Sequence, residues 1–303
     1  MTSPALIGFG ALGIAGVAAL AAARSVRRTA AWIAPAKHAI APELRALAFG
    51  RVQSLRDVTL HTSDGLTLHG WFSPGTRRAA VILVHGGAGD RMQLFPEALV
   101  LASNGYGILM YDSRACGESD GDIVSWGDRE RRDVTAALDF VTTQPEIDPQ
   151  RVALLGFSVG GSTVTLTAAA DTRVCAAIVA PVWTSLEDEM RAKAGRFGAL
   201  AAVPAVAYLR RAGIDVDAVR PIDHVAEIAP RPVLFIAGTG DIDTPVPVMQ
   251  RMFDAARSPK SLWIVPGATH GSAATTAPAE YESRVIGFLD ESLPAPALSP
   301  DRR

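Results

Sequence analysis

The sequence lacks several features that would place it in common functional classes. Its 303 residues include two cysteines, Cys116 and Cys175, which are too few for a disulfide framework and do not have metal-motif spacing. The formal net charge is −2 and the body has no basic stripe, so nucleic acid is not expected as a partner. HExxH, a Walker loop and a strand-following GxGxxG are also missing, so we expect no metal and no cofactor.

A long uncharged segment stands out at the N-terminus. Residues 6–23 carry no charge and approach the length of about 20 residues that a spanning helix needs. Arg24, Arg27 and Arg28 follow directly, whereas the first four residues carry no basic side chain. This distribution favours an uncleaved transmembrane anchor within residues 1–28, with the body on the cytoplasmic side. A cleaved, signal-like segment with an exported body is one alternative, and a soluble protein with an apolar start is another.

The pattern of the body predicts an α/β fold. Residues 58–61 and 66–72 flank a Ser-Asp-Gly turn signal and indicate a β-hairpin. Six further apolar runs are short and lack clean alternation, which is typical of strands covered on both faces. These runs span residues 80–84, 107–112, 152–156, 176–180, 233–237 and 261–265. Because helical patterns lie between them, we predict a mostly parallel eight-stranded sheet with helices on both faces.

The other segments suggest how the chain is organised around this sheet. Residues 29–56 are expected to be a linker with short helical pieces, residues 57–292 the main domain, and residues 293–303 a flexible tail. The connection between the sixth and seventh strands is too long for a simple crossover. We expect it to form a small helical cap at about 182–231, at the sheet edge where ligands bind. An ordinary pair of surface helices is the alternative.

The clearest chemical motif is GFSVG at residues 156–160, which matches GxSxG. It follows a strand run and precedes a helical run, which is the context that a nucleophile elbow needs. The two glycines let strand and helix pack closely while the serine takes a strained conformation that exposes its Oγ. We therefore predict Ser158 as a nucleophile rather than part of a structural turn.

A serine hydroxyl needs a base to take its proton, and in elbow-type serine enzymes the histidine comes last in the chain. His270 follows the last strand run in a turn, whereas His224 lies in a helical-looking stretch, so His270 is the predicted base. An acid should orient this histidine. Asp241 and Asp243 both qualify by position, because both follow the preceding strand.

Donors for an oxyanion are expected beside the nucleophile. HGGAG at residues 85–89 follows a strand directly, and its glycines let backbone N–H groups point into the site. We predict that the N–H groups of Gly87 and Val159 form the oxyanion hole. His85 is expected to pin its loop rather than react, and residues 112–119 to hold the floor and rim of the site.

These motifs together resemble the α/β-hydrolase superfamily, in its serine aminopeptidase-like and prolyl-oligopeptidase-like branch. The resemblance covers residues 55–292, and members with an N-terminal membrane anchor have a similar layout. The motifs that carry it, in order, are HGG at 85–87, DxR with GxS at 112–119, GFSVG at 156–160, GxxDxxTP at 238–245 and GATHG at 267–271. One departure is Ala115-Cys116, where relatives usually carry glycine first.

The resemblance implies a Ser158–His270–Asp241 triad and favours Asp241 over Asp243. It also implies Gly87 and Val159 as the oxyanion donors. The activity it implies is a serine hydrolase that cleaves a carboxylic ester or acyl thioester, with a small-molecule or lipid-like substrate. A serine peptidase is the alternative among enzymes. A catalytically idle, membrane-tethered binding protein is the alternative of another class, although a complete triad argues against it.

Overall fold

The strands confirm the predicted α/β architecture. The computed structural model describes the backbone of residues 4–293 and the side chains of residues 16–293. The strands are β1 (Arg56–His61), β2 (Thr67–Ser73), β3 (Ala80–Val84), β4 (Gly107–Tyr111), β5 (Val152–Gly156), β6 (Ala176–Val179), β7 (Val233–Gly238) and β8 (Lys260–Val265). They form one sheet in the order β1-β2-β4-β3-β5-β6-β7-β8. β2 is antiparallel to both β1 and β4, and all the other neighbours are parallel.

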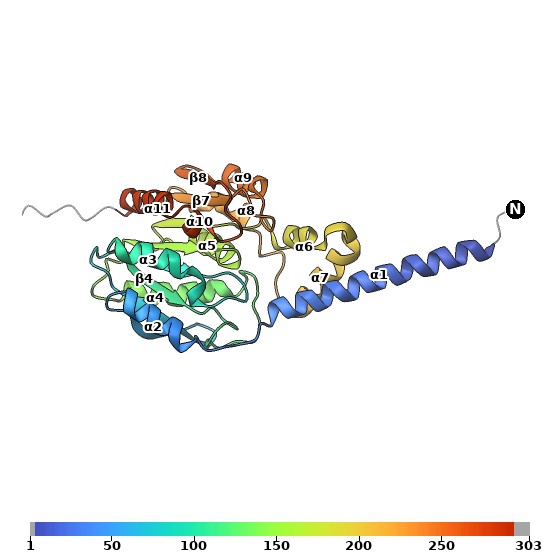
Figure 1. Ribbon diagram of the computed structural model, residues 1–303, viewed down its shortest axis with the longest axis horizontal. Helices are drawn as coiled ribbons and strands as arrows, with labels where there is room; N and C mark the ends of the chain where they lie inside the picture. The colour runs from blue at the N-terminus through green and yellow to red at the C-terminus, as the bar shows by residue number, and fades with distance from the viewer. Residues whose placement is uncertain (1–3, 294–303) are drawn as a thin grey trace, which may run out of the picture.

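Helices cover both faces of this sheet, as Figure 1 shows. The α-helices are α1 (Pro4–Ile33), α2 (Pro42–Arg51), α3 (Phe95–Ser103), α4 (Glu130–Thr142), α5 (Val159–Ala170), α6 (Leu186–Ala194), α7 (Ala199–Arg211), α8 (Pro221–His224), α9 (Val246–Ala255), α10 (Ala273–Thr276) and α11 (Pro278–Ser292). The described part of the chain also contains short 3₁₀ helices next to these elements, namely η1 (Arg91–Leu94), η2 (Gly195–Phe197) and η3 (Val225–Ile228).

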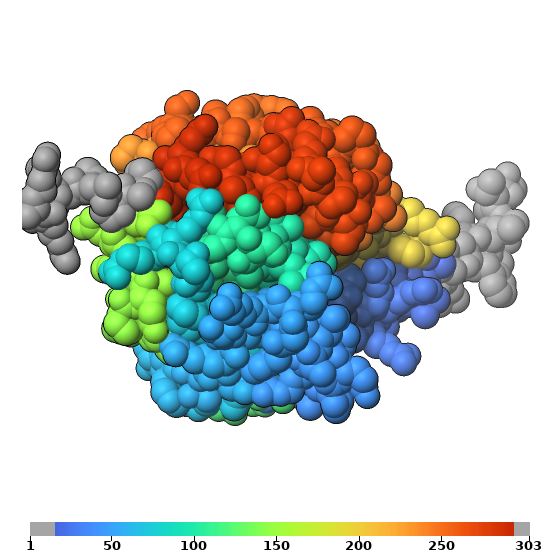
Figure 2. Space-filling model, turned by 60° about the vertical axis from the view of Figure 1, so that its left-hand side comes forward, coloured from blue at the N-terminus to red at the C-terminus, as the bar shows by residue number. Residues whose placement is uncertain are grey.

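The central strand β3 explains why the sheet needs two helical layers. Val81 and Leu83 share a core with α2, α3 and α11, whereas Ile82 and Val84 share one with α4, α5 and α9. Successive side chains of a strand point to opposite faces, so an apolar strand must be covered on both. Figure 2 shows the first layer, with α2 and α11 on either side of α3.

Helix α1 does not end near the predicted boundary at residue 28. It continues to Ile33, which is buried in the core, and Trp32 packs edge-on against Trp126 with ring centroids 5.9 Å apart. Ser25 Oγ also donates a hydrogen bond to the Ala201 carbonyl of α7 at 2.8 Å. Figure 1 shows the first part of α1 projecting away from the body. Burial of its last residues therefore makes the C-terminal part of α1 an integral part of the fold.

The predicted transmembrane segment coincides with the beginning of α1. Residues 6–15 of that run lie outside the part of the chain whose side chains the structure describes. From residue 16 to residue 293, no helix has the length and apolar character that crossing a membrane requires. Of the predicted tail, only Leu293 belongs to the described residues.

The predicted cap is helical and lies in the connection between β6 and β7. Helices α6 and α7 extend from the body toward α1, and α7 packs along α1 (Figure 1). Ser185 caps α6 by accepting the backbone N–H of Asp188 at 3.1 Å. Gly195, the first residue of η2, and Gly198, directly after it, have φ values of 52° and 49°, which lets the chain reverse between the two helices.

Candidate active site

Ser158 occupies a strained turn between β5 and α5. Its φ and ψ are 55° and −115°, a conformation that costs free energy for any residue with a Cβ. A Cβ on Gly156 would lie 2.3 Å from the Gly160 carbonyl oxygen, and a Cβ on Gly160 would lie 1.9 Å from that of Val84. Both distances are shorter than any van der Waals contact. The two glycines of the motif are therefore required for strand, turn and helix to pack as they do.

His270 and Asp241 form a hydrogen-bonded pair next to this turn. His270 Nδ1 lies 2.8 Å from Asp241 Oδ2, and the Asp241 side chain is fully buried. The other oxygen of Asp241 accepts the backbone N–H groups of Asp243 at 2.9 Å and Thr244 at 2.8 Å. A carboxylate held by three donors keeps one orientation. The pair therefore fixes the imidazole plane and leaves Nε2 available on the opposite side of the ring.

The competing acid and base form other contacts. Asp243 is exposed, and its carboxylate lies 3.6 Å from the Lys193 ammonium of the cap. The His224 side chain is 44% exposed and contacts Glu227 through Nδ1 at 3.1 Å. Asp241, Asp243 and His270 do place possible metal ligands within 4.8 Å of one another. Two of these atoms, His270 Nδ1 and Asp241 Oδ2, already bond to each other, so the pair is satisfied without an ion.

Gly87 and Val159 lie side by side at the proposed oxyanion position. A Cβ on Gly87 would come 2.8 Å from Val159 Cγ2. In the described part of the chain, neither backbone N–H donates to a protein acceptor. The Val159 N–H also belongs to the first turn of α5, where the helix dipole favours negative charge. Two adjacent donors without protein partners are what an oxyanion hole requires.

The loop that carries Gly87 is fixed by two side chains. His85 is buried, accepts the Ser113 N–H through Nε2 at 2.9 Å and donates from Nδ1 to the Gly86 carbonyl at 2.6 Å. Burial lowers the pKa of His85, which favours this neutral, structural role. Gln93 Oε1 accepts the Gly86 N–H at 2.7 Å. Sequence reasoning missed Gln93, because no motif connects a residue of η1 with the loop seven positions earlier.

The rim segment 112–119 is held by buried ion pairs. Arg91 contacts both oxygens of Asp112 at 2.6 and 3.0 Å, and Arg114 contacts both oxygens of Asp133 at 2.7–2.9 Å. Burial opposes ionisation of Asp112, but Arg91 outweighs it and keeps its pKa below the ordinary value. Ala115 has a φ of 62°, in the left-handed region that favours glycine. The segment is structural, as its sequence predicts.

The structure brings the reactive groups to one open cavity of about 260 Å³. Its lining consists of Gly86, Gly87, Gln93, Leu94, Phe157, Ser158, His270 and Gly271. The Phe157 ring packs against the His270 imidazole with centroids 4.7 Å apart. Ser158 and His270 do not form a hydrogen bond to each other here, and such bonds are often loose before substrate binds. Glu189 and Lys193, both in the cap helix α6, form an ion pair at 3.0 Å. The Lys193 ammonium also lies 3.6 Å from the Asp243 carboxylate, so this part of the cap lies near the same site.

Residues 92–295, more than half of the chain, match the prolyl oligopeptidase family. The chain belongs to this family. Among its relatives, the uncharacterized protein YfhR of Salmonella typhi is 30% identical over 253 residues, covering 78% of this chain and 82% of that protein. The uncharacterized protein Rv2307c of Mycobacterium tuberculosis is 32% identical over 222 residues, covering 71% and 72%.

Solved structures agree with this assignment at the level of the fold. An esterase of Pyrococcus furiosus superposes with a TM-score of 0.70 at 22% identity, covering 86% of this chain and 98% of that one. A hypothetical protein of Pseudomonas aeruginosa superposes with a TM-score of 0.67 at 21% identity, covering 85% and 100%. This member of the prolyl oligopeptidase family is therefore a hydrolase with the α/β-hydrolase fold.

Proposed function

We propose that the protein is a serine hydrolase that cleaves carboxylic esters or acyl thioesters through Ser158, His270 and Asp241. The observation that carries the proposal is the strained turn at Ser158, which opens into the same cavity as His270. A backbone held at a φ of 55° has no structural use that a glycine would not serve better, whereas a nucleophile needs that exposure.

In the proposed reaction, each step has a named group of the site. His270 Nε2 takes the Ser158 proton as Oγ attacks the carbonyl carbon, and the Gly87 and Val159 N–H groups stabilise the oxyanion. The tetrahedral intermediate collapses, and the departing alcohol or thiol receives the proton from His270. A water molecule, deprotonated by the same imidazole, then attacks the acyl-enzyme, which releases the acid and restores the serine. Asp241 accepts the Nδ1 hydrogen throughout and stabilises the imidazolium.

The cavity and the fold bear on which bond is cleaved. An ester or thioester is favoured because the cavity is open and because an esterase shares the fold. A serine peptidase is the second candidate, supported by the name of the matched family. The two are separated by comparing p-nitrophenyl esters of increasing acyl length with aminoacyl p-nitroanilides. Measurable turnover of the anilides that is lost in Ser158→Ala would favour the peptidase.

Labelling with a fluorophosphonate probe tests the nucleophile. We expect the wild type to be labelled and Ser158→Ala to be unlabelled while retaining its circular dichroism spectrum. Thr163→Ser, a conservative change in the same helix α5, serves as a labelled control. A folded wild type that does not label would contradict the serine hydrolase and support the idle binding protein. Labelling of Ser158→Ala would place the nucleophile elsewhere.

Membrane attachment through the N-terminal segment, with the catalytic body on the cytoplasmic side, is also proposed here. Its support is the uncharged run of residues 6–23 and the three arginines that follow. A lipid-like ester would then reach the site from the membrane. Fractionation of cells that express the full chain checks this. An even distribution between soluble and membrane fractions would contradict the anchor, and a periplasmic or secreted body would support the exported alternative.

A further inference from the structure

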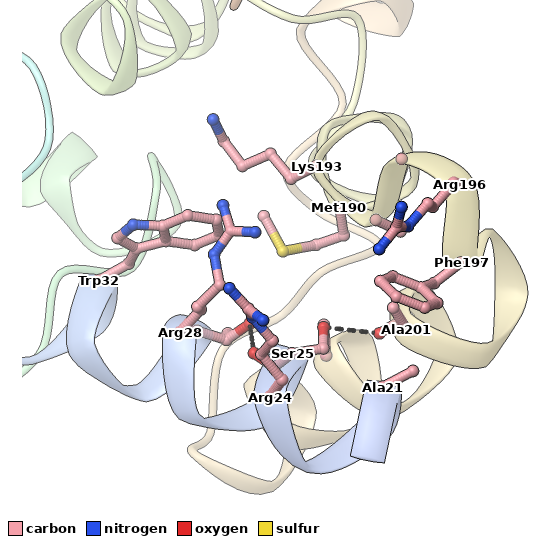
Figure 3. A pocket seen from close by; sticks show the side chains of 14 residues that line it. Ala21, Arg24, Ser25, Arg28, Trp32, Met190, Lys193, Arg196, Phe197 and Ala201 are labelled. Atoms are coloured by element: carbon pink, nitrogen blue, oxygen red, sulfur yellow. Dashed lines mark hydrogen bonds between the residues drawn. The ribbon is translucent and has the colours of Figure 1, made fainter. Parts of the chain in front are cut away.

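A second cavity, of about 290 Å³, lies between α1 and the cap and shares no residue with the lining around Ser158. Its lining includes four basic side chains and no acidic one. Arg24 and Arg28 come from α1, whereas Lys193 and Arg196 come from the end of α6 and from η2. Figure 3 shows the rings of Trp32 and Phe197 at opposite ends, with the two α1 arginines and Met190 between them.

Three of the four cations of this pocket have no acidic partner among the residues that the structure describes. Lys193 pairs with Glu189 at 3.0 Å, but among the described residues Arg24, Arg28 and Arg196 form no ion pair. Like charges that converge without counter-ions repel one another, and an anion bound among them removes that penalty. Guanidinium groups also bind phosphate oxygens in a bidentate way.

Contacts with one aromatic ring position two of the four cations. The Arg28 guanidinium lies 4.9 Å from the centre of the Trp32 ring, and the Lys193 ammonium lies 5.1 Å from the same ring. Ser25, which bonds to Ala201, ties α1 to α7 at the floor of the cavity. The first turn of α7 borders the cavity and has no side-chain cap, so its positive end adds to the field.

Apolar groups surround this charged centre. Met190 and Phe197 line the cavity itself. Toward the N-terminus of α1, one of the helices that line it, Val17 and Leu20 are 56% and 71% exposed. A small inorganic anion would leave all of this apolar surface in water, whereas an attached chain would cover it.

We propose that this pocket binds a phosphorylated amphiphile, in which a phosphate group sits among Arg24, Arg28 and Arg196 and an alkyl chain covers the exposed apolar residues. Such a phosphate group with its alkyl chain can belong either to a lipid in a bilayer or to a single dissolved molecule. The pocket is separate from the catalytic cavity, so this binding is independent of what Ser158 attacks.

Isothermal titration calorimetry of the full chain with dodecyl phosphate, below its micelle concentration, tests the proposal. We expect one saturable site in the wild type. In the Arg24→Glu/Arg28→Glu variant, each charge-assisted hydrogen bond that is lost should weaken binding by roughly tenfold. Arg196→Glu, on the opposite wall, should weaken binding independently. Arg257→Glu makes the same charge change at an exposed position outside the pocket and should leave the affinity unchanged.

Ligand controls separate the phosphate from the chain. Dodecyl trimethylammonium has the same chain with the opposite charge and should not bind at this site. Inorganic phosphate should bind far more weakly, and an equal affinity would overturn the amphiphile. The proposal is also overturned if the wild type does not bind dodecyl phosphate, or if the double variant binds it equally while its melting temperature matches the wild type.

Vesicle sedimentation then distinguishes the two sources of the phosphate. Binding to phosphatidylcholine vesicles that contain phosphatidic acid, abolished in the Arg24→Glu/Arg28→Glu variant, would support a bilayer headgroup. Binding of dissolved dodecyl phosphate with no arginine-dependent binding to such vesicles would support a soluble ligand. Charge reversal leaves Lys193 and Arg196 beside the new glutamates, so the variant has internal partners and is expected to fold.

Discussion

Asp241 holds His270 with one carboxylate oxygen and its own turn with the other. The bond to His270 Nδ1 is 2.8 Å long, and the second oxygen accepts two backbone N–H groups of the same turn. Asp243, two residues later, points to the cap and lies 3.6 Å from the Lys193 ammonium. The proposed triad therefore depends on which of two neighbouring carboxylates the turn directs inward.

Replacement of these two aspartates should separate their roles. We expect Asp241→Asn to lower kcat on a p-nitrophenyl ester by roughly 10³–10⁴, because the amide no longer favours the productive tautomer and cannot stabilise the imidazolium. Asp243→Asn is the matched control and should leave kcat close to the wild-type value. A larger decrease in Asp243→Asn than in Asp241→Asn would assign the acid to Asp243.

The proposed oxyanion hole can be tested with one substitution that introduces a steric clash and a second substitution that removes it. In Gly87→Ala the new Cβ would lie 2.8 Å from Val159 Cγ2, so the loop must shift and its N–H loses alignment. We expect kcat to fall by roughly 10²–10³. Val159→Ala keeps the backbone N–H and should be nearly neutral.

The double variant Gly87→Ala/Val159→Ala removes the clashing methyl group and should recover most of the kcat. Steady-state kinetics on one ester measures all three variants. If the double variant is as slow as Gly87→Ala, then the decrease does not come from this clash. If Gly87→Ala itself turns over the ester as fast as the wild type, then the N–H of Gly87 is not the donor that the proposed mechanism requires.

Glu97 should make the stability fall as pH rises. It is buried beneath the site, one oxygen has no hydrogen-bond partner, and burial raises its pKa from 4.5 to about 7. Between these values the unfolded chain loses the proton while the folded protein keeps it. The free energy of unfolding therefore decreases from about pH 4.5 upward and levels off above about pH 7, by about 3 kcal/mol in total.

Glu97→Gln keeps the shape of this side chain without its charge. The difference in unfolding free energy between Glu97→Gln and wild type, measured by urea denaturation, should be small at about pH 4 and favour the variant at about pH 8. A difference that does not change with pH would mean that Glu97 is ionised at its normal pKa in the folded protein.

Two glycine-to-alanine changes should have opposite effects on stability. A Cβ on Gly160 would lie 1.9 Å from the Val84 carbonyl oxygen, whereas one on Gly287 in α11 would have no atom within 4 Å. We expect Gly160→Ala to lower the unfolding free energy by more than about 3 kcal/mol. Gly287→Ala should raise it by roughly 0.5–1 kcal/mol, because alanine has the better helix propensity. Thermal unfolding measures both, and a stable Gly160→Ala would contradict the close packing of the turn.

The sequence predicts those parts of the site that depend on local structure. The turn around Ser158 could be predicted because two glycines and a serine define it within five residues. The sheet could be predicted because runs such as residues 80–84 are apolar throughout. The choice between Asp241 and Asp243 needed a resemblance, because both have the right residue type and nearly the same position.

The rest depends on contacts between elements that no local motif connects. Gln93 orients the Gly86 loop from a separate helix, and Lys193 approaches Asp243 from the cap. Neither interaction leaves a pattern along the chain. The continuation of α1 to Ile33 was likewise missed, because the predicted boundary followed the arginines and not the burial of Trp32 and Ile33.

The position of α1 has a practical consequence for producing the protein. Proteins with an apolar N-terminus are commonly shortened to remove it before expression. A truncation after residue 23 would keep Ser25, Arg28 and Trp32, and with them the contacts to α7 and to Trp126. A truncation after residue 33 would expose the buried side of α7 and leave the cap without its supporting wall. The choice of start site therefore decides whether the cap of a shortened enzyme keeps its native contacts.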